Sequence, residues 1–486
     1  MNAPPLHSKT GSDKHPLLCF HNTLSNSLET FSPHSNNEVL MYNCGPTVYG
    51  SQHIGNMRAA VVADLLRRTL FAWGYTVKQV INITDFGHLS SDADEGEDKM
   101  TMGLKREGME LTIANMRVLA EKYTEEYFKD IESLGVPLDS IIFPRASDYI
   151  AEQISLIMAL EEKGYAYTTE QGVYYDVSHF SAYGKLGNIN LAGLREGARI
   201  QENAHKRGPF DFILWKSDKH LGWNSPWGLG FPGWHIECTS MIFKLLGQQI
   251  DIHTGGIEHI PVHHNNEIAQ AEAVSGKPFA TYWLHNDHIT IGGKKIAKSL
   301  GNTVYLTDIV KRGISPFALR YWFLTAHYRS PANFTWEALE GARTALTRLS
   351  RMYQEYKIEA KSVSTDSAFE NSFFSALGHD LDTPRALALL WDYMKNANIT
   401  AEQKFAALLT VDLTLGLGFS AGTLAEPFTV IDIDSLPDAV QSLLAAREEA
   451  RQSKDFMKAD ELRSNIYDLG YEVQDTARGI SVTART

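Results

Sequence analysis

Cysteine is scarce in this chain, which has only Cys19, Cys44 and Cys238 among its 486 residues. An odd number of widely spaced cysteines excludes a disulfide-stapled scaffold and indicates a reducing, cytoplasmic location. No apolar run is long enough to span a bilayer, and residues 1–16, MNAPPLHSKTGSDKHP, lack the apolar segment of a secretory signal. We therefore expect a cytoplasmic protein that has no membrane contact and begins with a disordered tail over 1–16.

Positive charge is also in short supply. The chain carries 45 Lys and Arg against 58 Asp and Glu, a net charge of −13, and residues 440–486 hold seven basic and eight acidic side chains. Nucleic-acid affinity depends largely on neutralising phosphates, so this composition does not favour it. A local basic surface is sufficient, however, and net charge alone leaves the partner undecided. The P-loop pattern G-x-x-x-x-G-K-[ST] is absent as well.

A strand–helix–strand pattern follows the tail. Residues 38–44, EVLMYNC, read as a buried strand, 56–73 have apolar residues at a helical period that ends at Gly74, and 75–85 return to strand. This order predicts a βαβ unit and a parallel sheet with ligands at the carboxyl ends of its strands. An acidic loop over 86–100 and a long helix near 108–134 are expected next.

The rest of the chain divides by pattern. Aromatic strands and Gly-rich loops over 136–228 indicate an insertion, after which the βαβ character resumes, and residues beyond 306 read mainly as amphipathic helices, with a linker near 425–438. The predicted fold class is α/β, a Rossmann-like parallel-sheet domain with an inserted connective domain, followed by a mostly α-helical C-terminal half. The expected parts are a tail 1–16, a split Rossmann-like domain 17–135 and 229–300, an insertion 136–228, and regions 301–340, 341–425 and 426–486.

Two short clusters have the chemistry of phosphate sites. His53-Ile54-Gly55-Asn56 stands at a helix start, where unpaired N–H groups favour an anion and glycine permits close approach. In IGGKKIAKSLGN, 291–302, Lys295 and Lys298 flank a turn bounded by glycines, a pattern suited to a loop that neutralises phosphate. Taken singly, the first pattern is more often a helix-capping histidine, and the second is as often a solvated lysine-rich loop.

A third group has metal-ligand character. His263 and Glu267 are four residues apart in VHHNNEIAQAE, on one face of a predicted helix, and Cys238 lies on another helix in PGWHIEC. The pair His259 and His263 has the same spacing, but Pro261 makes a continuous helix between them unfavourable. Each of these residues is also compatible with a structural role, and spacing does not connect Cys44 to them.

Together, in this order and on a βαβ scaffold, the two phosphate clusters resemble the HIGH and KMSKS signatures of class I aminoacyl-tRNA synthetases. Asn56 replaces the last histidine, and Ile296 and Ala297 replace methionine and serine. With CGPTVYG, PGWHIEC, HHNNE and KSLGN, the chain is similar to the cysteinyl-tRNA synthetase family over nearly its whole length, from CFHNTLSNSLETF near residue 19 to KADELR. It departs from the family pattern at Phe231 and Asn265.

The resemblance implies a set of site residues. One Zn²⁺ per chain is expected on Cys44, Cys238, His263 and Glu267. For ATP with Mg²⁺ the resemblance implies Gly45, Pro46, Thr47, His53, Gly55, Asn56, Lys298 and Ser299. Catalysis is expected from His53, Asn56, Lys295 and Lys298, and contact with the amino acid from Thr47, Thr84, Trp234 and His253.

The implied activity is ATP-dependent conversion of L-cysteine to cysteinyl-adenylate, followed by transfer to the 3′-terminal adenosine of tRNA(Cys). A purely steric pocket rejects serine poorly, whereas zinc binds thiolate strongly, so a metal would supply the selectivity. The implied partners are tRNA(Cys), L-cysteine and ATP, bound by a monomer with a stem-contact region at 301–340 and an anticodon-binding module at 426–486. Two alternatives stay open, a ligase that joins cysteine to a small amino sugar and a non-catalytic zinc-stabilised binding protein.

Lys298 gives the first test. We expect Lys298→Ala to leave the zinc content intact and to lower adenylate formation by about 10²-fold or more, because the lysine would meet charge that develops on the phosphates. Cysteine-dependent pyrophosphate exchange and metal analysis measure the two effects. An unchanged exchange rate would refute the role assigned to Lys298.

Overall fold

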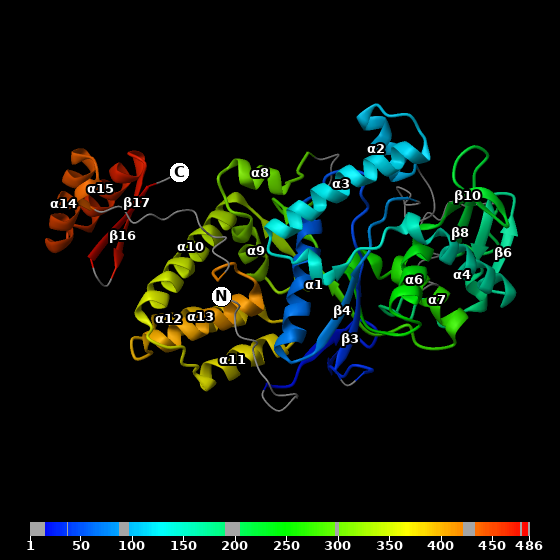
Figure 1. Cartoon of the computed structure of the whole chain (residues 1–486), viewed down its shortest axis with the longest axis horizontal. Helices are drawn as coiled ribbons and strands as arrows, with labels where there is room; N and C mark the ends of the chain where they lie inside the picture. The colour runs from blue at the N-terminus through cyan, green and yellow to red at the C-terminus, as the bar shows by residue number, and fades with distance from the viewer. Residues whose placement is uncertain are drawn as a thin grey trace. The chain divides into compact units, whose positions relative to one another are not determined.

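The computed structural model of the protein describes residues 15–35, 37–86, 97–189, 205–296, 301–420, 433–476 and 479–484 (Figure 1). Met1–Ser420 form one compact unit and Ala421–Thr486 a second. Among the described helices, none has both the length and the apolar character needed to cross a membrane.

The expected tail, 1–16, lies outside the described residues up to position 14. The last two residues of that range make contacts. Nε1 of Trp73 donates a hydrogen bond to the carbonyl of Pro16 at 2.9 Å, and the ring of His15 packs against Trp73 and Phe374. The described fold therefore begins before Leu17, the residue at which it was expected to start.

A five-stranded parallel sheet lies at the centre of the first unit. In spatial order its strands are β12 (Ala280–Asn286), β11 (Ile250–Gly256), β3 (Glu38–Asn43), β4 (Thr76–Ile81) and β5 (Ile141–Ile142). The helix α1 (Ile54–Ala72) connects β3 to β4, which confirms the predicted βαβ unit and the α/β fold class.

The strand order reverses beside β3. The chain runs from β3 through β4 to β5 on one side and later returns to place β11 on the other side, where Ile252 pairs with Met41. Side chains that follow β3 and β11 therefore meet at the carboxyl edge of the sheet. In open α/β sheets this switch point is where ligands bind.

Helices cover both faces of the sheet (Figure 1). α1 packs on β4 and β11, and α6 (Trp234–Leu245) and α7 (His263–Ser275) lie on the other side of β3 and β4. Tyr42 of β3 and Val80 of β4 share a buried apolar cluster with Met241 of α6 and Ile268 of α7. Burial of these side chains fixes α6 and α7 against the sheet, and it therefore also fixes the side chains on their N-terminal turns.

The helix predicted near 108–134 is present as α3 (Ile113–Ser133), which begins five residues later than expected. A helix that the sequence did not predict, α2 (Lys99–Glu107), precedes it. Gly108 ends α2 in the left-handed region, at φ 68°, and the side chain of Thr112 accepts a hydrogen bond from the backbone N–H of Asn115 to begin α3. These stop and start signals interrupt the apolar period. Residues 87–96 of the predicted acidic loop lie outside the described part.

The inserted segment forms a separate antiparallel sheet. In spatial order its strands are β6 (Ala166–Thr169), β7 (Gly172–Tyr175), β8 (Phe212–Ser217), β10 (Gly228–Pro232) and β9 (Trp223–Ser225). α4 (Ile150–Glu162) packs beside this sheet and against α6 and α7. The structural limits differ from 136 and 228, because β5 still belongs to the parallel sheet and β10 continues to Pro232.

The remaining described elements of the first unit are mostly helical. The helices are α8 (Leu306–Lys311), α9 (Pro316–Leu324), α10 (Trp336–Glu359), α11 (Ser367–Gly378), α12 (Thr383–Lys395) and α13 (Ala401–Leu415). The short strands are β1 (Cys19–Asn22), β2 (Ser27–Thr30), β13 (Ile289–Ile291), β14 (Lys294–Lys295) and β15 (Ala332–Phe334). α9 to α13 agree with the helices expected from the apolar period beyond residue 306.

The described part of the second unit contains a short 3-10 turn (Ile433–Ser435), two α-helices and a hairpin. α14 (Asp438–Gln452) and α15 (Phe456–Asp468) precede β16 (Tyr471–Thr476) and β17 (Gly479–Ala484), which pair antiparallel. Its described core has two small buried clusters, one of Leu436, Val440, Leu444, Ile466, Val473 and Val482 and one of Ala450, Ala459 and Leu462.

A buried ion network joins the later helices to the sheet domain. Asp64 of α1 accepts hydrogen bonds from Arg320 of α9 at 2.6 Å and from Arg68 at 2.7 Å. Arg320 also donates to the carbonyls of Leu134 and Leu415, at the ends of α3 and α13. Burial alone would raise the pKa of Asp64, but the arginines outweigh it and lower the pKa to about 2.

We expect Asp64→Asn to destabilise the protein by about 3–5 kcal/mol, because it leaves the buried guanidinium of Arg320 without its counter-charge. The carboxylate contributes stability above its unfolded pKa near 3.8 and loses it as the pH falls toward 2, so the variant should show less acid sensitivity over that range. Urea unfolding followed by circular dichroism measures both effects.

The matched control is Glu340→Gln, which removes the exposed ion pair with Arg343 on α10. Its cost should be below about 1 kcal/mol. Equal losses for the two variants would contradict the role assigned to the buried network.

Candidate active site and metal centre

Cys44 stands immediately after β3, at the switch point of the sheet. Its backbone N–H donates to the carbonyl of Thr254 in β11 at 3.0 Å. The next residue must be glycine, because a Cβ on Gly45 would lie 1.7 Å from the carbonyl oxygen of Asn82. The amide of Gly45 also donates to Oδ1 of Asn82 at 2.7 Å. The chain after β3 thus crosses the chain after β4 at Gly45 and Asn82, and this crossing holds the Cys44 thiol at the carboxyl edge of the sheet.

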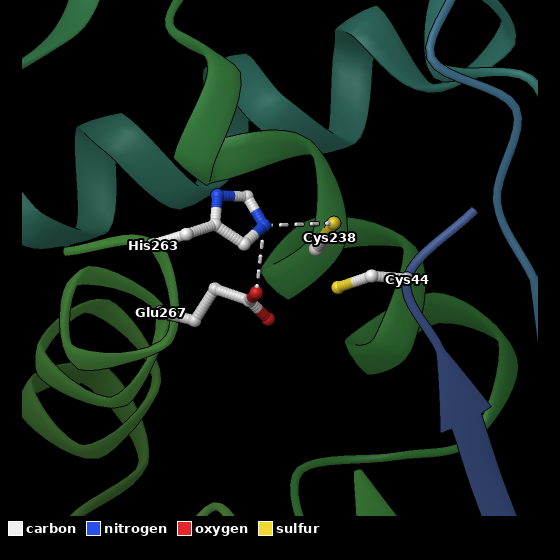
Figure 2. Close-up of side chains that lie close together, drawn as sticks. All are labelled: Cys44, Cys238, His263 and Glu267. Atoms are coloured by element: carbon white, nitrogen blue, oxygen red, sulfur yellow. Dashed lines mark hydrogen bonds and ion pairs between the residues drawn. The ribbon is translucent and has the colours of Figure 1, made fainter. Parts of the chain in front are cut away.

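Three further side chains converge on this thiol (Figure 2). Cys238 lies on α6, His263 is the first residue of α7, and Glu267 follows one turn later. Nε2 of His263 lies 3.7 Å from Sγ of Cys238 and 3.0 Å from Oε1 of Glu267. One ligand atom from each of the four residues lies within 4.8 Å of every other. The structure therefore assembles the Cys44, Cys238, His263 and Glu267 group expected from the sequence.

The chemistry of this group fits a metal ion. Two thiols, an imidazole and a carboxylate are the donors of a tetrahedral zinc site. Oε1 of Glu267 is buried and makes no hydrogen bond to the described residues. Nδ1 of His263 lies 2.8 Å from Nδ1 of His235, so it can carry the ring proton and leave Nε2 as a donor atom. These groups are aimed at one point and are incompletely satisfied without a cation.

The two thiols of the group differ in acidity. Burial would raise the pKa of Cys44, but hydrogen bonds from Cys238 and the neighbouring histidines, with the charge of His264, hold that pKa well below its usual value. Burial raises the pKa of Cys238. The thiolate is the form that binds metals, so the lowered pKa of Cys44 favours metal binding by its sulfur.

A second, overlapping group lies behind the first. Nε2 of His253 lies 2.8 Å from Oε2 of Glu267, and Nε2 of His264 lies 3.3 Å from Sγ of Cys44. Cys44, His253, His264 and Glu267 also satisfy the geometric condition for a metal group. Three members of the first group, Cys44, Cys238 and His263, belong to the described lining of a cavity, whereas Cys44 alone represents the second group there. The two histidines of the second group therefore serve as supports that orient Glu267 and Cys44.

A cavity of about 650 Å³ lies in front of the metal group. Its volume is in the range of small-ligand sites. Twelve of the residues expected at the site line it, namely Cys44, Gly45, Pro46, Thr47, His53, Gly55, Asn56, Thr84, Trp234, Cys238, His263 and Lys295. Residues expected to contact the amino acid and residues expected to contact the phosphates thus line the same cavity.

His53 begins α1 at one wall of this cavity. Its Nδ1 accepts a hydrogen bond from the N–H of Gly55 at 3.1 Å, and Oδ1 of Asn56 accepts one from the N–H of His53 at 3.2 Å. A Cβ on Gly55 would lie 2.9 Å from Cε1 of the ring, so only glycine lets the imidazole lie over the first turn. Asn56 therefore performs the capping that fixes the motif, in the place of the last histidine of HIGH.

The lysine-containing segment returns to the same wall. Gly292 and Gly293, both at positive φ, form the turn of the hairpin β13–β14, which carries Lys295 to the cavity. Beyond the loop, the carbonyl of Val304 accepts a hydrogen bond from the N–H of Ile54 at 3.0 Å. Lys298 and Ser299 lie outside the described residues, between these two anchors.

Two residues that were expected to contact the amino-acid substrate make contacts that the sequence did not indicate. His253 is buried and stacks on Trp283 with ring centroids 4.6 Å apart, and it is absent from the described lining of the cavity. Its placement differs from the expected substrate contact because β11 aims it at Glu267. Thr84 does line the cavity, and its hydroxyl donates to the buried carboxylate of Glu237.

Sequence reasoning missed His264, Glu237 and Lys99. His264 adjoins His263 and was hidden by the assumption that one helical face carries the ligands, and Glu237 precedes Cys238 directly. Lys99 lay in a segment expected to be loop, yet it lines the cavity. Trp234, which was expected to contact the amino acid, lies beside the metal group, with its ring centroid 4.2 Å from that of His263 at an interplanar angle of 29°.

His253→Phe tests the supporting role. The variant keeps an aromatic ring against Trp283 but removes the contact with Glu267, so we expect metal affinity to fall by about 10- to 100-fold. Competition with a chromophoric chelator for Zn²⁺ measures this. His253→Gln, which can still donate to Glu267, should lose less, and equal losses in both variants would contradict the orienting role.

Comparison with known proteins agrees with this geometry. The model of the tRNA synthetases class I (C) catalytic domain matches residues 30–344, and that of the cysteinyl-tRNA ligase anticodon binding domain matches 434–482. The cysteine--tRNA ligase 1 of Burkholderia lata is 43% identical, covering 95% of this chain and 96% of its own, and the cysteine--tRNA ligase of Thermus thermophilus is 42% identical, covering 95% and 98%.

Solved structures resemble the fold at low sequence identity. The LeuRS of Agrobacterium radiobacter, in a ternary complex with tRNA and LeuAMS, has a TM-score of 0.59 at 10% identity, covering 82% of this chain and 86% of that one. The methionyl-tRNA synthetase of Mycobacterium tuberculosis with methionyl-adenylate has a TM-score of 0.53 at 13% identity, covering 84% and 87%. From its catalytic-domain match and its relatives, the chain belongs to the cysteine--tRNA ligase family of class I aminoacyl-tRNA synthetases.

Proposed function

We propose that this chain is a ligase that activates L-cysteine with ATP and transfers the cysteinyl group to tRNA(Cys). The cysteine carboxylate attacks the α-phosphate of ATP to give cysteinyl-adenylate and pyrophosphate, and the 3′-terminal adenosine of the tRNA then accepts the acyl group. Membership of the cysteine--tRNA ligase family supports this activity, as does a metal group that opens into the cavity lined by the His53 motif.

The observation that carries the proposal is the position of Cys44. Its thiol belongs to the metal group, and the three residues after it, Gly45, Pro46 and Thr47, line the cavity toward the start of α1. A single turn of chain therefore adjoins both the thiol-recognition site and the phosphate site. This arrangement places an amino acid and ATP within reach of each other, which is the main contribution that adenylate formation requires of the protein.

Selection of cysteine over serine follows from the donor set. Cys44, Cys238, His263 and Glu267 would hold one Zn²⁺, which when bound prefers a thiolate to a hydroxyl as a further ligand. Trp234 closes the site on one side through its stack with His263, and His253 and His264 keep the carboxylate and thiol ligands in place. The pocket thereby rejects a substrate that differs only in one atom.

The phosphates of Mg²⁺-ATP would lie at the start of α1. His53, Gly55 and Asn56 form this helix terminus, whose partial positive charge favours an anion. Lys295 of β14 faces the same cavity, and we place Lys298 and Ser299 at the phosphates from the sequence motif. Asn56 keeps the terminus rigid through its capping bond, so the departure from HIGH preserves the geometry.

The acceptor is proposed to be tRNA because residues 434–482 match an anticodon-binding domain. We assign stem contact to 301–340, the helical bundle to 341–425 and anticodon contact to 426–486. A small amino-sugar acceptor has no support from the comparisons. We further propose that the enzyme acts as a monomer in the cytoplasm.

The proposal predicts zinc-dependent selectivity. We expect about one Zn²⁺ per chain and cysteine-dependent pyrophosphate exchange that exceeds the serine-dependent reaction by on the order of 10⁴-fold, as for a site that engages the distinguishing atom directly. Cys238→Ser should lose both the metal and the exchange. Cys19→Ser, which changes a thiol of β1 outside the metal group, should retain both.

Two outcomes would contradict the proposal. A purified protein without metal that still discriminates serine would remove the zinc-based selectivity. A protein that forms cysteinyl-adenylate but acylates an amino sugar and leaves a tRNA(Cys) transcript uncharged would remove the assigned acceptor.

A further inference from the structure

Arg58 is a buried cation near the start of α1, and each branch of its guanidinium binds a different segment of the chain. The residue is 1% exposed. Nη1 donates to the carbonyls of Asp287 at 3.0 Å and His288 at 3.3 Å. Nη2 donates to the carbonyls of His327 at 3.0 Å and Ser330 at 2.9 Å. The planar fork of an arginine lets one side chain hold both segments at once.

The two segments lead into strands β13 and β15, which pair in parallel. They also bind each other, because the N–H of Asp287 donates to the carbonyl of Tyr328 at 2.9 Å and the N–H of Ala332 donates to the carbonyl of His288 at 3.1 Å. β13 continues into the hairpin whose other strand, β14, carries Lys295. Arg58 therefore joins α1 to the base of the hairpin that carries this lysine.

The hydrogen bonds of Arg58 differ from those of an arginine farther along α1. Arg67 donates to the carboxylate of Asp64 at 2.9 Å, whereas all four bonds that the described structure gives Arg58 go to carbonyl oxygens. Burial lowers the pKa of Arg58 to about 10, an effect that the charge of Asp287 partly offsets. A buried cation held by carbonyls instead of a carboxylate is costly to the fold. Departures of this kind concentrate at functional sites.

The parts of the cavity assigned to the phosphates come from two separate sheets. α1, which begins after His53, follows β3 of the parallel sheet, whereas Lys295 belongs to the three-stranded sheet β14–β13–β15. Strand pairing within the parallel sheet therefore does not set the distance between His53 and Lys295. Contacts between α1 and the base of the hairpin set it instead. Arg58 makes four of them, and the bond from the N–H of Ile54 to the carbonyl of Val304 is the corresponding contact after the hairpin.

We propose that Arg58 is a positioning residue for adenylate formation, whose two-branched side chain sets the distance between the phosphate-binding start of α1 and Lys295. This inference rests on the proposed function and adds to it the element that aligns its two phosphate-binding parts. The metal group is held by other elements, β3, α6 and α7. Cysteine binding and the ATP-dependent step should therefore respond differently to a change at Arg58.

Arg58→Lys tests the two-branched reach, because it keeps the charge but a single ammonium can bind only one of the two segments. We expect the kcat of cysteine-dependent pyrophosphate exchange to fall by about 10- to 100-fold, as for a small misplacement of reacting groups, and the KM for ATP to rise. The zinc content and the dissociation constant for cysteine, measured by calorimetric titration, should stay unchanged. Amide hydrogen exchange over residues 289–295 should become faster. Arg58→Met should lose at least as much activity.

The matched control is Asp64→Asn, which also removes a buried polar contact of α1 but lies outside the described lining of the cavity. Below its unfolding temperature it should keep the kcat, the KM for ATP and the exchange over 289–295 of the unaltered protein. Equal kinetic losses in this control would overturn the proposal by showing that Arg58 acts through stability alone. Full kcat in Arg58→Lys, or a parallel loss of cysteine affinity, would overturn it as well.

Failure of the proposed function gives a different result. The unaltered protein would then show no cysteine-dependent pyrophosphate exchange, whereas the amide hydrogen-exchange comparison would still test the contact between α1 and the hairpin. Unchanged hydrogen exchange over 289–295 in Arg58→Lys would overturn the positioning role whatever the activity of the protein.

Discussion

The site depends on one steric constraint, the crossing of the chain after β3 with the chain after β4. Asn82 occupies the space that a side chain at position 45 would need, and its amide oxygen accepts the N–H of Gly45. Cys44 can therefore adopt only a narrow range of positions at the carboxyl edge of the sheet. The backbone fixes the position of the Cys44 thiol more rigidly than a side-chain rotamer preference would. The other ligands of the metal group are therefore arranged around a well-defined point.

The fold brings the other ligands to this fixed point through strand pairing. β11 pairs with β3 in parallel register, and the residues after β11 lead directly into α7. His263 at the first turn of α7 and Glu267 in the next turn thus face the end of β3. Their supports come from the same elements, since His253 lies within β11 and His264 follows His263. One strand–helix connection therefore supplies both the ligands and the groups that orient them.

Charge in this protein is arranged locally, and the net charge does not describe the cavity. The chain is acidic overall, whereas the described cavity wall combines Lys99, Lys295 and the start of α1, which favour anions, with the acids Glu258 and Asp287. The buried arginines beside Asp64 are used differently. Arg320 donates hydrogen bonds to the carbonyls of Leu134 and Leu415, and these bonds stabilise the ends of α3 and α13 instead of binding a ligand. Net charge consequently carries little information about where anions are bound.

The sequence by itself determined the elements whose signals are local. The βαβ unit and the helices beyond residue 306 follow from the apolar period and from the residues that end the helices. Family motifs also led to residues of the cavity, including Trp234 and Thr84. The helix expected near 108–134 agrees with α3, whereas α2 (Lys99–Glu107) was missed because the acidic segment before it was expected to be a loop up to residue 100.

Only the tertiary structure decided which distant side chains meet. No spacing connects Cys44 to Cys238, and the sequence resemblance alone proposed that link; the pairing of β3 with β11 is what brings them together. The same pairing turned His253 from the substrate toward Glu267, and the placement of α2 put Lys99 beside Trp234. Strand order and helix packing are set by the summed burial of many apolar side chains, a quantity that no short stretch of sequence contains.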